Sequence, residues 1–186
     1  PFPLQYPVVV KSVNEEASLG ISHASLVTND EKLIERVAFM HESFGVDVIA
    51  EQYVEGRELY IGVLGHERLQ TLPIWELPFD QLPEGTPHIA TAKVKWDLGY
   101  QKKYNIDTHR AEGLTAEQKD EIARLAKRIY RALRLTGYGR IDLRLTPEGR
   151  IYVLEANPNP DLKRNEDFAA SAAAAGLEYP AVLQRI

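Results

Sequence analysis

Apolar and polar residues are arranged in short runs that predict a series of strands along the first half of the chain. The β-branched run 7–11 is typical of a buried strand. Further apolar runs predict strands at about 24–27, 46–53, 58–64 and 69–75. The pattern therefore indicates a chain with substantial sheet content, interrupted by helices.

Two helices are indicated by capping boxes and by apolar stripes at helical spacing. Thr28 with Glu31 predicts the start of a helix that ends at Gly45, and Thr115 with Gln118 predicts the start of another. The stripe positions are Leu33, Val37, Met40 and Phe44 in the first helix, and Ile122, Leu125, Ile129 and Leu133 in the second. Each helix is expected to pack its stripe against a sheet.

The last third of the chain predicts a β-hairpin and a final helix. Strands at 139–145 and 151–155 are joined by the turn Thr146-Pro147-Glu148-Gly149, and an alanine-rich helix is expected over about 166–175. Segment 76–113 shows no regular period, which predicts a long loop that is either functional or disordered. Hairpins with helices between them predict an α+β fold.

Composition narrows the functional classes. The 186 residues are 44% apolar, which suits one domain or two small lobes. A formal charge of −5 without a basic block argues against nucleic-acid binding, and no apolar run is long enough to cross a membrane. The chain has no cysteine, so we expect a cytoplasmic protein. It opens on Pro1 and soon enters a buried strand, which predicts a fragment of a longer protein.

The hairpin carries the strongest chemical signal. Because side chains alternate along paired strands, Asp142 and Glu155 are predicted on one face, with Arg140 and Asn157 on that face at the open end of the hairpin. Two carboxylates and an amide are oxygen ligands suited to Mg²⁺, and a guanidinium beside them could stabilise a transferred phosphoryl group. The alternative is a solvated face with an Asp–Arg pair. The following Asn157-Pro158-Asn159-Pro160 loop favours the site, because it fixes polar residues at the end of an apolar strand.

Four motifs in order resemble the ATP-binding portion of D-alanine–D-alanine ligases and their ATP-grasp relatives. They are Val8-Val9-Val10-Lys11 with Ala17-Ser18-Leu19-Gly20, Glu51-Gln52-Tyr53-Val54-Glu55-Gly56-Arg57-Glu58, Lys102-Lys103-Tyr104, and Arg140-Ile141-Asp142 with Leu154-Glu155-Ala156-Asn157-Pro158-Asn159-Pro160. The resemblance covers nearly the whole chain. It implies an ATP-grasp fold of two sheet-plus-helix lobes, residues 1–55 and 56–186, with the nucleotide between them and an N-terminal substrate domain absent.

The same resemblance assigns roles to individual residues. Those implied to bind ATP are Lys11, Ser18, Glu51, Gln52, Tyr53, Val54, Glu58 and Lys103. Glu58 would accept hydrogen bonds from ribose, and Lys103 would contact the γ-phosphate. Arg140 would contact the reacting phosphoryl group or intermediate, and the metal ligands would be Asp142, Glu155 and Asn157. Taken singly, Lys11, Glu58 and Lys103 also fit ordinary solvated surface residues.

Departures from the family pattern fall on the substrate side. Glu16 and Ala17 replace a glycine and a serine of the family's phosphate loop, and Glu166 stands where the family has a serine that holds the acceptor's carboxylate. With Asp161 and Asp167 nearby, we expect an acidic acceptor pocket and an amine acceptor without a carboxylate there. The alternative is that these acids only stabilise the start of the 166–175 helix.

The resemblance implies an ATP-dependent carboxylate–amine ligase core that uses Mg²⁺, with Mn²⁺ as a substitute. Its expected partners are a small-molecule carboxylate and an amine, and a homodimer formed through the absent N-terminal part is a further expectation. Two alternatives remain open at this stage. One is an Mg–ATP-binding module without ligase activity of its own, and the other is an α+β scaffold in which the polar residues are structural.

Overall fold

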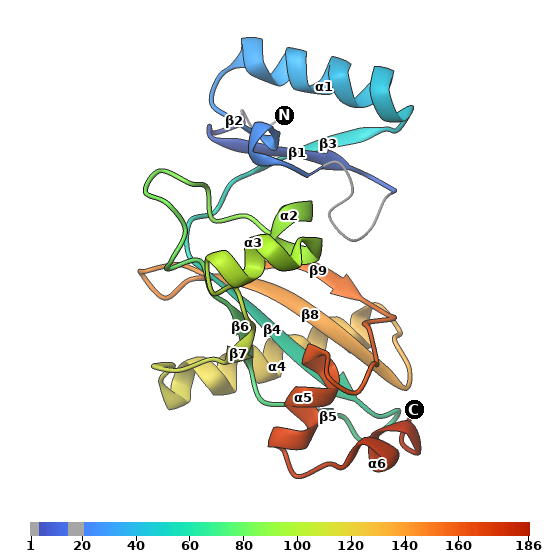
Figure 1. Ribbon diagram of the computed structural model, residues 1–186. Helices are drawn as coiled ribbons and strands as arrows, with labels where there is room; N and C mark the ends of the chain where they lie inside the picture. The colour runs from blue at the N-terminus through green and yellow to red at the C-terminus, as the bar shows by residue number, and fades with distance from the viewer. Residues whose placement is uncertain (1–3, 15–20) are drawn as a thin grey trace. The chain divides into compact units, whose positions relative to one another are not determined.

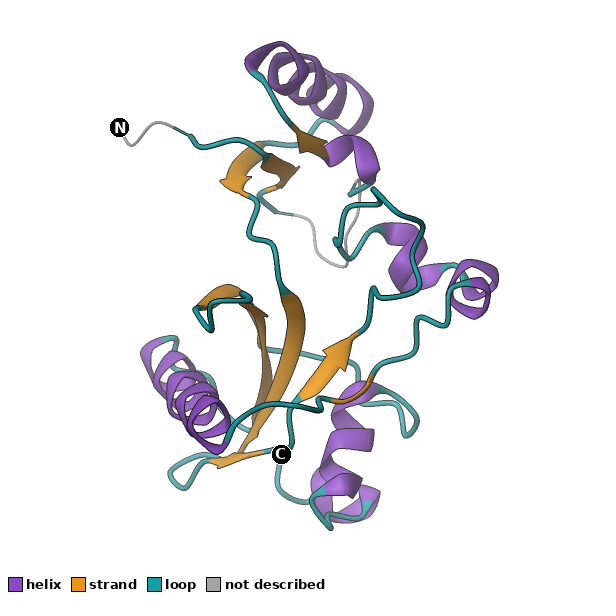
Figure 2. Ribbon diagram, turned by 90° about the vertical axis from the view of Figure 1, so that its left-hand side faces the viewer, coloured by secondary structure: helices purple, strands orange, loops and turns teal. Residues whose placement is uncertain are grey.

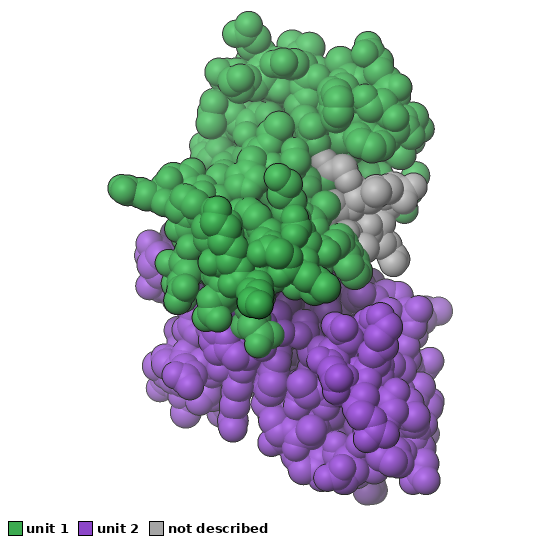
Figure 3. All heavy atoms as spheres, viewed as in Figure 1, with its two compact units in different colours: residues 1–54, 79–107 green, residues 55–78, 108–186 purple. Residues whose placement is uncertain are grey.

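The computed structural model describes residues 4–14 and 21–186, and these form two compact units. Unit 1 comprises residues 1–54 and 79–107, and unit 2 comprises residues 55–78 and 108–186 (Figure 3). The division expected from sequence, 1–55 and 56–186, assigned segment 79–107 to the larger lobe. In the structure this segment groups with unit 1, where the N–H of Ala92 donates to the carbonyl of Ile21 at 3.2 Å.

Unit 1 contains a three-stranded antiparallel sheet with one long helix against it (Figure 1). The strands are β1 (Val8–Ser12), β2 (Leu26–Val27) and β3 (Val48–Gln52) in the order β2-β1-β3, preceded at β2 by the 3-10 turn η1 (His23–Ser25). Alternate residues of β1 are buried against the helix α1 (Asp30–Phe44). The opposite face of the sheet carries Lys11 and Glu51 together with the apolar residues Val9 and Ile49.

The start of α1 differs from the predicted capping box. The cap is Asn29, whose side chain accepts from the N–H of Lys32 at 2.9 Å, so the helix begins two residues after Thr28. The predicted Thr28–Glu31 box is therefore wrong, because Asn29 satisfies the exposed N–H groups of the first turn instead. The predicted end is confirmed, since Gly45 closes the helix with φ 64°.

Segment 76–113 is less irregular than its sequence suggests. It contains the short helices α2 (Ala92–Trp96) and α3 (Leu98–Lys103), capped by the side chains of Thr91 and Asp97. It also includes most of β6 (Trp75–Leu77) and all of β7 (His109–Arg110), which belong to unit 2. The prediction of a long loop is thus wrong for part of this region.

Unit 2 is built on an antiparallel sheet with the order β7-β6-β4-β8-β9, and β5 pairs separately with β4. The long strands are β4 (Arg57–Leu64), β8 (Tyr138–Leu145) and β9 (Ile151–Asn157). The predicted strand 69–75 is replaced by β5 (Gln70–Thr71) and β6, because Pro73 between them has no N–H to donate to a neighbouring strand.

Helices cover parts of both faces of this sheet (Figure 2). On one face α4 (Ala116–Ala132) packs Ile122, Ala126 and Tyr130 against alternate apolar residues of β4 and β8. The predicted Thr115–Gln118 capping box of α4 is confirmed, with both hydrogen bonds present. The other face meets α5 (Asp167–Ala174), which is followed by α6 (Tyr179–Leu183). The remainder of that second face is polar and carries the candidate site.

Candidate functional site

A β-bulge sets the geometry of the β8–β9 hairpin. Leu145 pairs with Ile151, and this register continued without change would place Asp142 opposite Leu154. The bulge between Asp142 and Leu143 adds one residue on β9, so that Asp142 pairs with Glu155 instead. The predicted grouping of Asp142 and Glu155 on one face is confirmed, and Arg140 lies opposite Asn157 as expected.

The bulge is explained by the core on the other side of the sheet. Ile151 and Ala156 of β9 both pack against the α4 core cluster, although they are five residues apart. Residues an odd number apart point to opposite faces of a regular strand. One extra residue between them therefore lets both apolar side chains reach the core while Glu155 turns to the opposite face.

We use the term polar face for the charged and polar side chains that β4, β8 and β9 direct away from α4. Its members are Glu58, Tyr60, Arg140, Asp142, Arg144, Tyr152, Glu155 and Asn157. They share this face because Glu58 pairs with Arg144, and Tyr60 pairs with Asp142, across β4 and β8.

Two ion pairs occupy the centre of the polar face. Arg140 binds Asp142 through two hydrogen bonds, from Nε to Oδ1 at 2.7 Å and from an Nη to Oδ2 at 2.8 Å. Arg144 donates to Glu58 Oε2 at 2.8 Å and to the carbonyl of Gly56 at 2.9 Å. Asp142, Arg144 and Glu58 are almost fully buried. Each buried charge thus has an opposite partner, as its loss of hydration requires.

Tyr60 lies between the two ion pairs. Its hydroxyl donates to Glu58 Oε1 at 2.9 Å, and the Arg140 guanidinium lies over its ring, 4.6 Å from the centroid. Burial raises the pKa of the Tyr60 hydroxyl well above its ordinary value, and the negative charges of Glu58 and Asp142 act in the same direction. Tyr60 is therefore neutral and remains a hydrogen-bond donor at physiological pH.

Arg140 is charged in spite of its surroundings. Burial alone would lower its pKa, but the adjacent Asp142 carboxylate outweighs this effect, and the pKa lies above its ordinary value. The guanidinium is consequently a fixed positive charge beside two carboxylates that could hold a cation.

The oxygen atoms at the end of the hairpin suit a divalent metal of the Mg²⁺ type. Asp142 and Glu155 supply carboxylates, and Asn157 supplies an amide oxygen that also accepts the N–H of Asn159 at 2.8 Å. Within residues 4–14 and 21–186, no three His, Cys, Asp or Glu side chains gather to form a complete metal site. The donors fit Mg²⁺ that takes the rest of its ligands from water and phosphate.

The Glu58 carboxylate is held by hydrogen bonds from other residues of unit 2. Both of its carboxylate oxygens accept hydrogen bonds from protein side chains, and it is 4% exposed. Because the carboxylate is buried and accepts these two hydrogen bonds, Arg144 and Tyr60 fix its orientation. Neither residue was selected from the sequence. The sequence does contain a signal for them. Polar residues alternate along β4 at Glu58 and Tyr60, and along β8 at positions 140, 142 and 144. The two patterns form one face only when β4 is paired with β8.

The other predicted nucleotide residues belong to unit 1. Lys11 Nζ contacts Glu51 Oε2 at 2.5 Å, on the sheet face opposite α1, and both side chains are partly exposed. Glu51 and Gln52 are the last residues of β3, and Tyr53 and Val54 connect this strand to unit 2. Lys103 ends α3, where its ammonium group lies 4.8 Å from the centroid of the Tyr104 ring. Ser18 lies outside the described residues.

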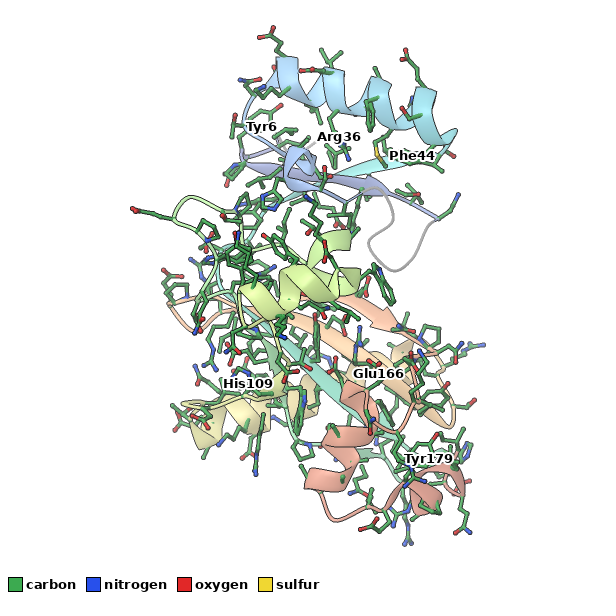
Figure 4. The ribbon with its side chains drawn as sticks, in the orientation of Figure 1. Tyr6, Arg36, Phe44, His109, Glu166 and Tyr179 are labelled. Carbon is green, nitrogen blue, oxygen red and sulfur yellow. The ribbon has the colours of Figure 1, made fainter. Side chains whose placement is uncertain are left out.

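The acidic residues expected to line an acceptor pocket lie at or before the start of α5. Glu166 occupies the N-cap position, is exposed, and makes no side-chain capping bond (Figure 4). Asp161 pairs with Lys163 at 2.9 Å. Asp167 accepts a hydrogen bond from the Thr108 hydroxyl. Negative charge is therefore present at the start of α5. This arrangement fits an acidic pocket, and it equally fits the alternative that the acids stabilise the helix through its dipole.

None of the helices in the part of the chain that the structure describes is both long and apolar enough to span a membrane.

Comparison with known proteins gives one consistent result. The family model described as the C-terminus of D-Ala–D-Ala ligase matches residues 3–186. A D-alanine–D-alanine ligase of Desulfotalea psychrophila is 30% identical over 98% of this chain and 53% of its own length. The chain thus spans about half the length of such relatives.

Solved structures agree with this assignment. The VanG D-Ala:D-Ser ligase from Enterococcus faecalis superposes with a TM-score of 0.75 at 25% identity, over 98% of this chain and 49% of that one. The D-alanine–D-alanine ligase from Bacillus anthracis, solved in complex with ATP, gives a TM-score of 0.71 at 24% identity, over 97% and 51%. The fold is therefore that of the ATP-grasp enzymes, and the chain belongs to the D-alanine–D-alanine ligase family, of which it matches the C-terminal portion.

Proposed function

We propose that this chain is the ATP-binding core of an ATP-dependent carboxylate–amine ligase that requires Mg²⁺, or Mn²⁺ in its place. The observation that carries the proposal is the polar face, where Asp142, Glu155 and Asn157 lie together beside the fixed charge of Arg140. Membership in a ligase family supports the class of reaction. The related ligase from Bacillus anthracis has been solved with ATP, which supports the nucleotide.

The proposed reaction has two steps. A carboxylate oxygen of the first substrate attacks the γ-phosphorus of ATP, the bond to the β–γ bridging oxygen breaks, and ADP leaves with the electron pair. The amine nitrogen of the second substrate then attacks the acyl carbon of the resulting acyl phosphate. Inorganic phosphate leaves, and the nitrogen loses a proton to solvent or a base. An amide bond has formed at the cost of one ATP.

The residues of the chain act by positioning and by charge. Asp142, Glu155 and Asn157 would hold the Mg²⁺ ions, which neutralise the charge of the phosphates. Arg140 would stabilise the negative charge that develops on the transferred phosphoryl group.

Further residues are proposed for the nucleotide itself from the sequence motifs. Lys11 and Lys103 would contact its phosphates, and the 51–54 segment its adenine. Glu58 would bind its ribose through the second lone pair of a carboxylate oxygen, since each oxygen already accepts one bond from Tyr60 or Arg144. Ser18 is proposed for the phosphates from its sequence motif only.

For the acceptor, we propose an amine that lacks a carboxylate at the point where Glu166 lies. Negative charge from Glu166 and Asp161 would repel an acceptor carboxylate and favour a neutral or cationic group. Steady-state ATP turnover with a panel of amines and amino acids tests this proposal. A clear preference for D-alanine as the acceptor would refute it.

A nucleotide-binding module without ligase activity is the second candidate. The chain matches the C-terminal family model and spans about half the length of its relatives, so nucleotide binding and ligation have to be tested separately. Use of ATP favours a cytoplasmic protein in either case.

Calorimetric titration with a non-hydrolysable ATP analogue, with and without Mg²⁺, tests the site common to both candidates. We expect binding that Mg²⁺ strengthens, and loss of this strengthening in Asp142→Asn and Glu155→Gln. Glu121→Gln, which neutralises an exposed carboxylate on α4, is the matched control and should bind like wild type. Binding that is equal with and without Mg²⁺ would contradict the proposed metal site.

A further inference from the structure

Tyr60 has no assigned role, yet it contacts both ion pairs of the polar face. Glu58 and Arg144 lie on one side of it, and Arg140 and Asp142 lie on the other. Through these contacts the Gly56 carbonyl is connected to Asp142, across β4 and β8 and along most of their paired length. Tyr60 is the member of this chain of contacts that joins the two ion pairs.

The two ends of the Tyr60 side chain do different things. The hydroxyl satisfies one oxygen of Glu58, and the ring supports the guanidinium of Arg140. An arginine over an aromatic ring is attracted to its face, and the attraction is strongest when both groups are shielded from water. Tyr60 is 5% exposed, and the Arg140 side chain is 17% exposed, so this pair is shielded.

The position of Arg140 in turn determines that of Asp142. The bidentate geometry uses one lone pair on each carboxylate oxygen and leaves the others for a further ligand. A guanidinium held by the ring presents the carboxylate in one orientation. Without the ring, Arg140 could rotate away and Asp142 would lose this constraint.

We propose that Tyr60 is a positioning residue: its ring holds Arg140 and, through Arg140, Asp142 in place for metal-bound phosphates, while its hydroxyl orients Glu58. This inference rests on the proposed nucleotide and metal site. It predicts that the two functions of Tyr60 can be separated by substitution, because phenylalanine keeps the ring and loses only the hydroxyl.

The readout is the ratio of two dissociation constants for a non-hydrolysable ATP analogue, measured without and with Mg²⁺. Tyr60→Phe should weaken both and leave their ratio unchanged. Tyr60→Leu should lower the ratio by about tenfold, the size expected for loss of a shielded cation–aromatic contact. Tyr60→Met is a second variant without a ring that fills more of the buried space. Thermal unfolding of each variant identifies any general loss of structure.

A direct readout of Arg140 needs no nucleotide. In nitrogen-15 NMR spectra, the Nε–H signal of Arg140 should be sharp and protected in wild type and Tyr60→Phe, and broadened in Tyr60→Leu and Tyr60→Met. Tyr179→Leu is the matched control, because it removes another arginine–tyrosine contact of unit 2, with Arg164 at 4.9 Å. Its ratio and its Arg140 signal should equal those of wild type.

The outcomes separate the inference from the proposed function. An unchanged ratio and an unchanged Arg140 signal in both ring-less variants would overturn the role of Tyr60 while leaving the nucleotide site in place. An equal loss in Tyr179→Leu would also overturn it, since the effect would be general. Failure of the folded wild-type chain to bind the analogue would instead overturn the proposed function, and this inference with it.

Discussion

The buried ion pair between Arg144 and Glu58 gives a sharp test of how unit 2 is held together. The two side chains are 4% and 6% exposed, and their charged atoms are 2.8 Å apart. Arg144→Met removes the positive charge and leaves the Glu58 carboxylate buried beside Tyr60. Removal of one partner of such a pair typically costs about 3–5 kcal/mol of unfolding free energy, because the remaining charge is uncompensated. The lost hydrogen bond to the Gly56 carbonyl adds to this cost.

Urea unfolding followed by tryptophan fluorescence can measure this effect within unit 2. The chain has two tryptophans, of which Trp75 lies in β6 beside Tyr60 and Trp96 lies in unit 1. A Trp96→Phe background leaves Trp75 as the reporter. In the double variant with Glu58→Gln the buried charge is absent, so its cost should be clearly smaller than the sum of the two single costs.

Two results would refute this reasoning. One is a cost below about 1 kcal/mol for Arg144→Met, the value typical of an exposed pair. The other is strict additivity in the double variant. Lys163→Met is the control, because it breaks the exposed pair with Asp161 and should leave the unfolding curve unchanged.

Three further predictions concern the backbone and the pH response of unit 2. Gly56→Ala should destabilise the fold by more than the roughly 1 kcal/mol expected for Gly45→Ala. A Cβ at Gly56 would lie 2.3 Å from a carbonyl oxygen of β8, whereas one at Gly45 meets nothing within 4 Å. Equal costs in urea unfolding would contradict the structure. Deletion of Leu154 removes the extra residue and leaves a regular ladder in which Glu155 still pairs with Asp142, so Mg²⁺-dependent binding of the ATP analogue should be retained, and its loss by calorimetry would argue against the register. Burial raises the pKa of the Tyr60 hydroxyl in the folded state, so its contribution to stability is complete below about pH 10 and is lost as pH rises toward the folded pKa. The unfolding free energy of wild type should thus fall more steeply above about pH 10 than that of Tyr60→Phe. Parallel curves of unfolding free energy against pH would contradict this.

The β8–β9 hairpin was predictable because its signals are local. A four-residue turn with proline and glycine separates two alternating strands, and the side chains at their open end follow from the period of two. The bulge could not be predicted in this way. It depends on where Ile151 and Ala156 meet α4, which is a property of the packed unit and not of the hairpin.

The remaining differences have the same origin. The helices α2 and α3 have five and six residues, too few for an apolar period to be recognised, although Thr91 and Asp97 are ordinary caps. Arg144 and Glu58 are 86 residues apart in sequence. Each taken alone resembles a charged residue of an exposed strand, and only the pairing of β4 with β8 makes them partners.

The bulge in β9 has a consequence beyond the placement of Glu155. β9 is the last strand of its sheet, and Tyr152, Val153 and Leu154 on it are 36–46% exposed. A regular edge strand with apolar residues is a template on which a strand of another molecule can add, and this is a common route to aggregation. The extra residue interrupts the regular spacing of the backbone N–H and C=O groups along that edge. The irregularity that turns a carboxylate toward the polar face therefore also protects the protein from association with itself, strand to strand.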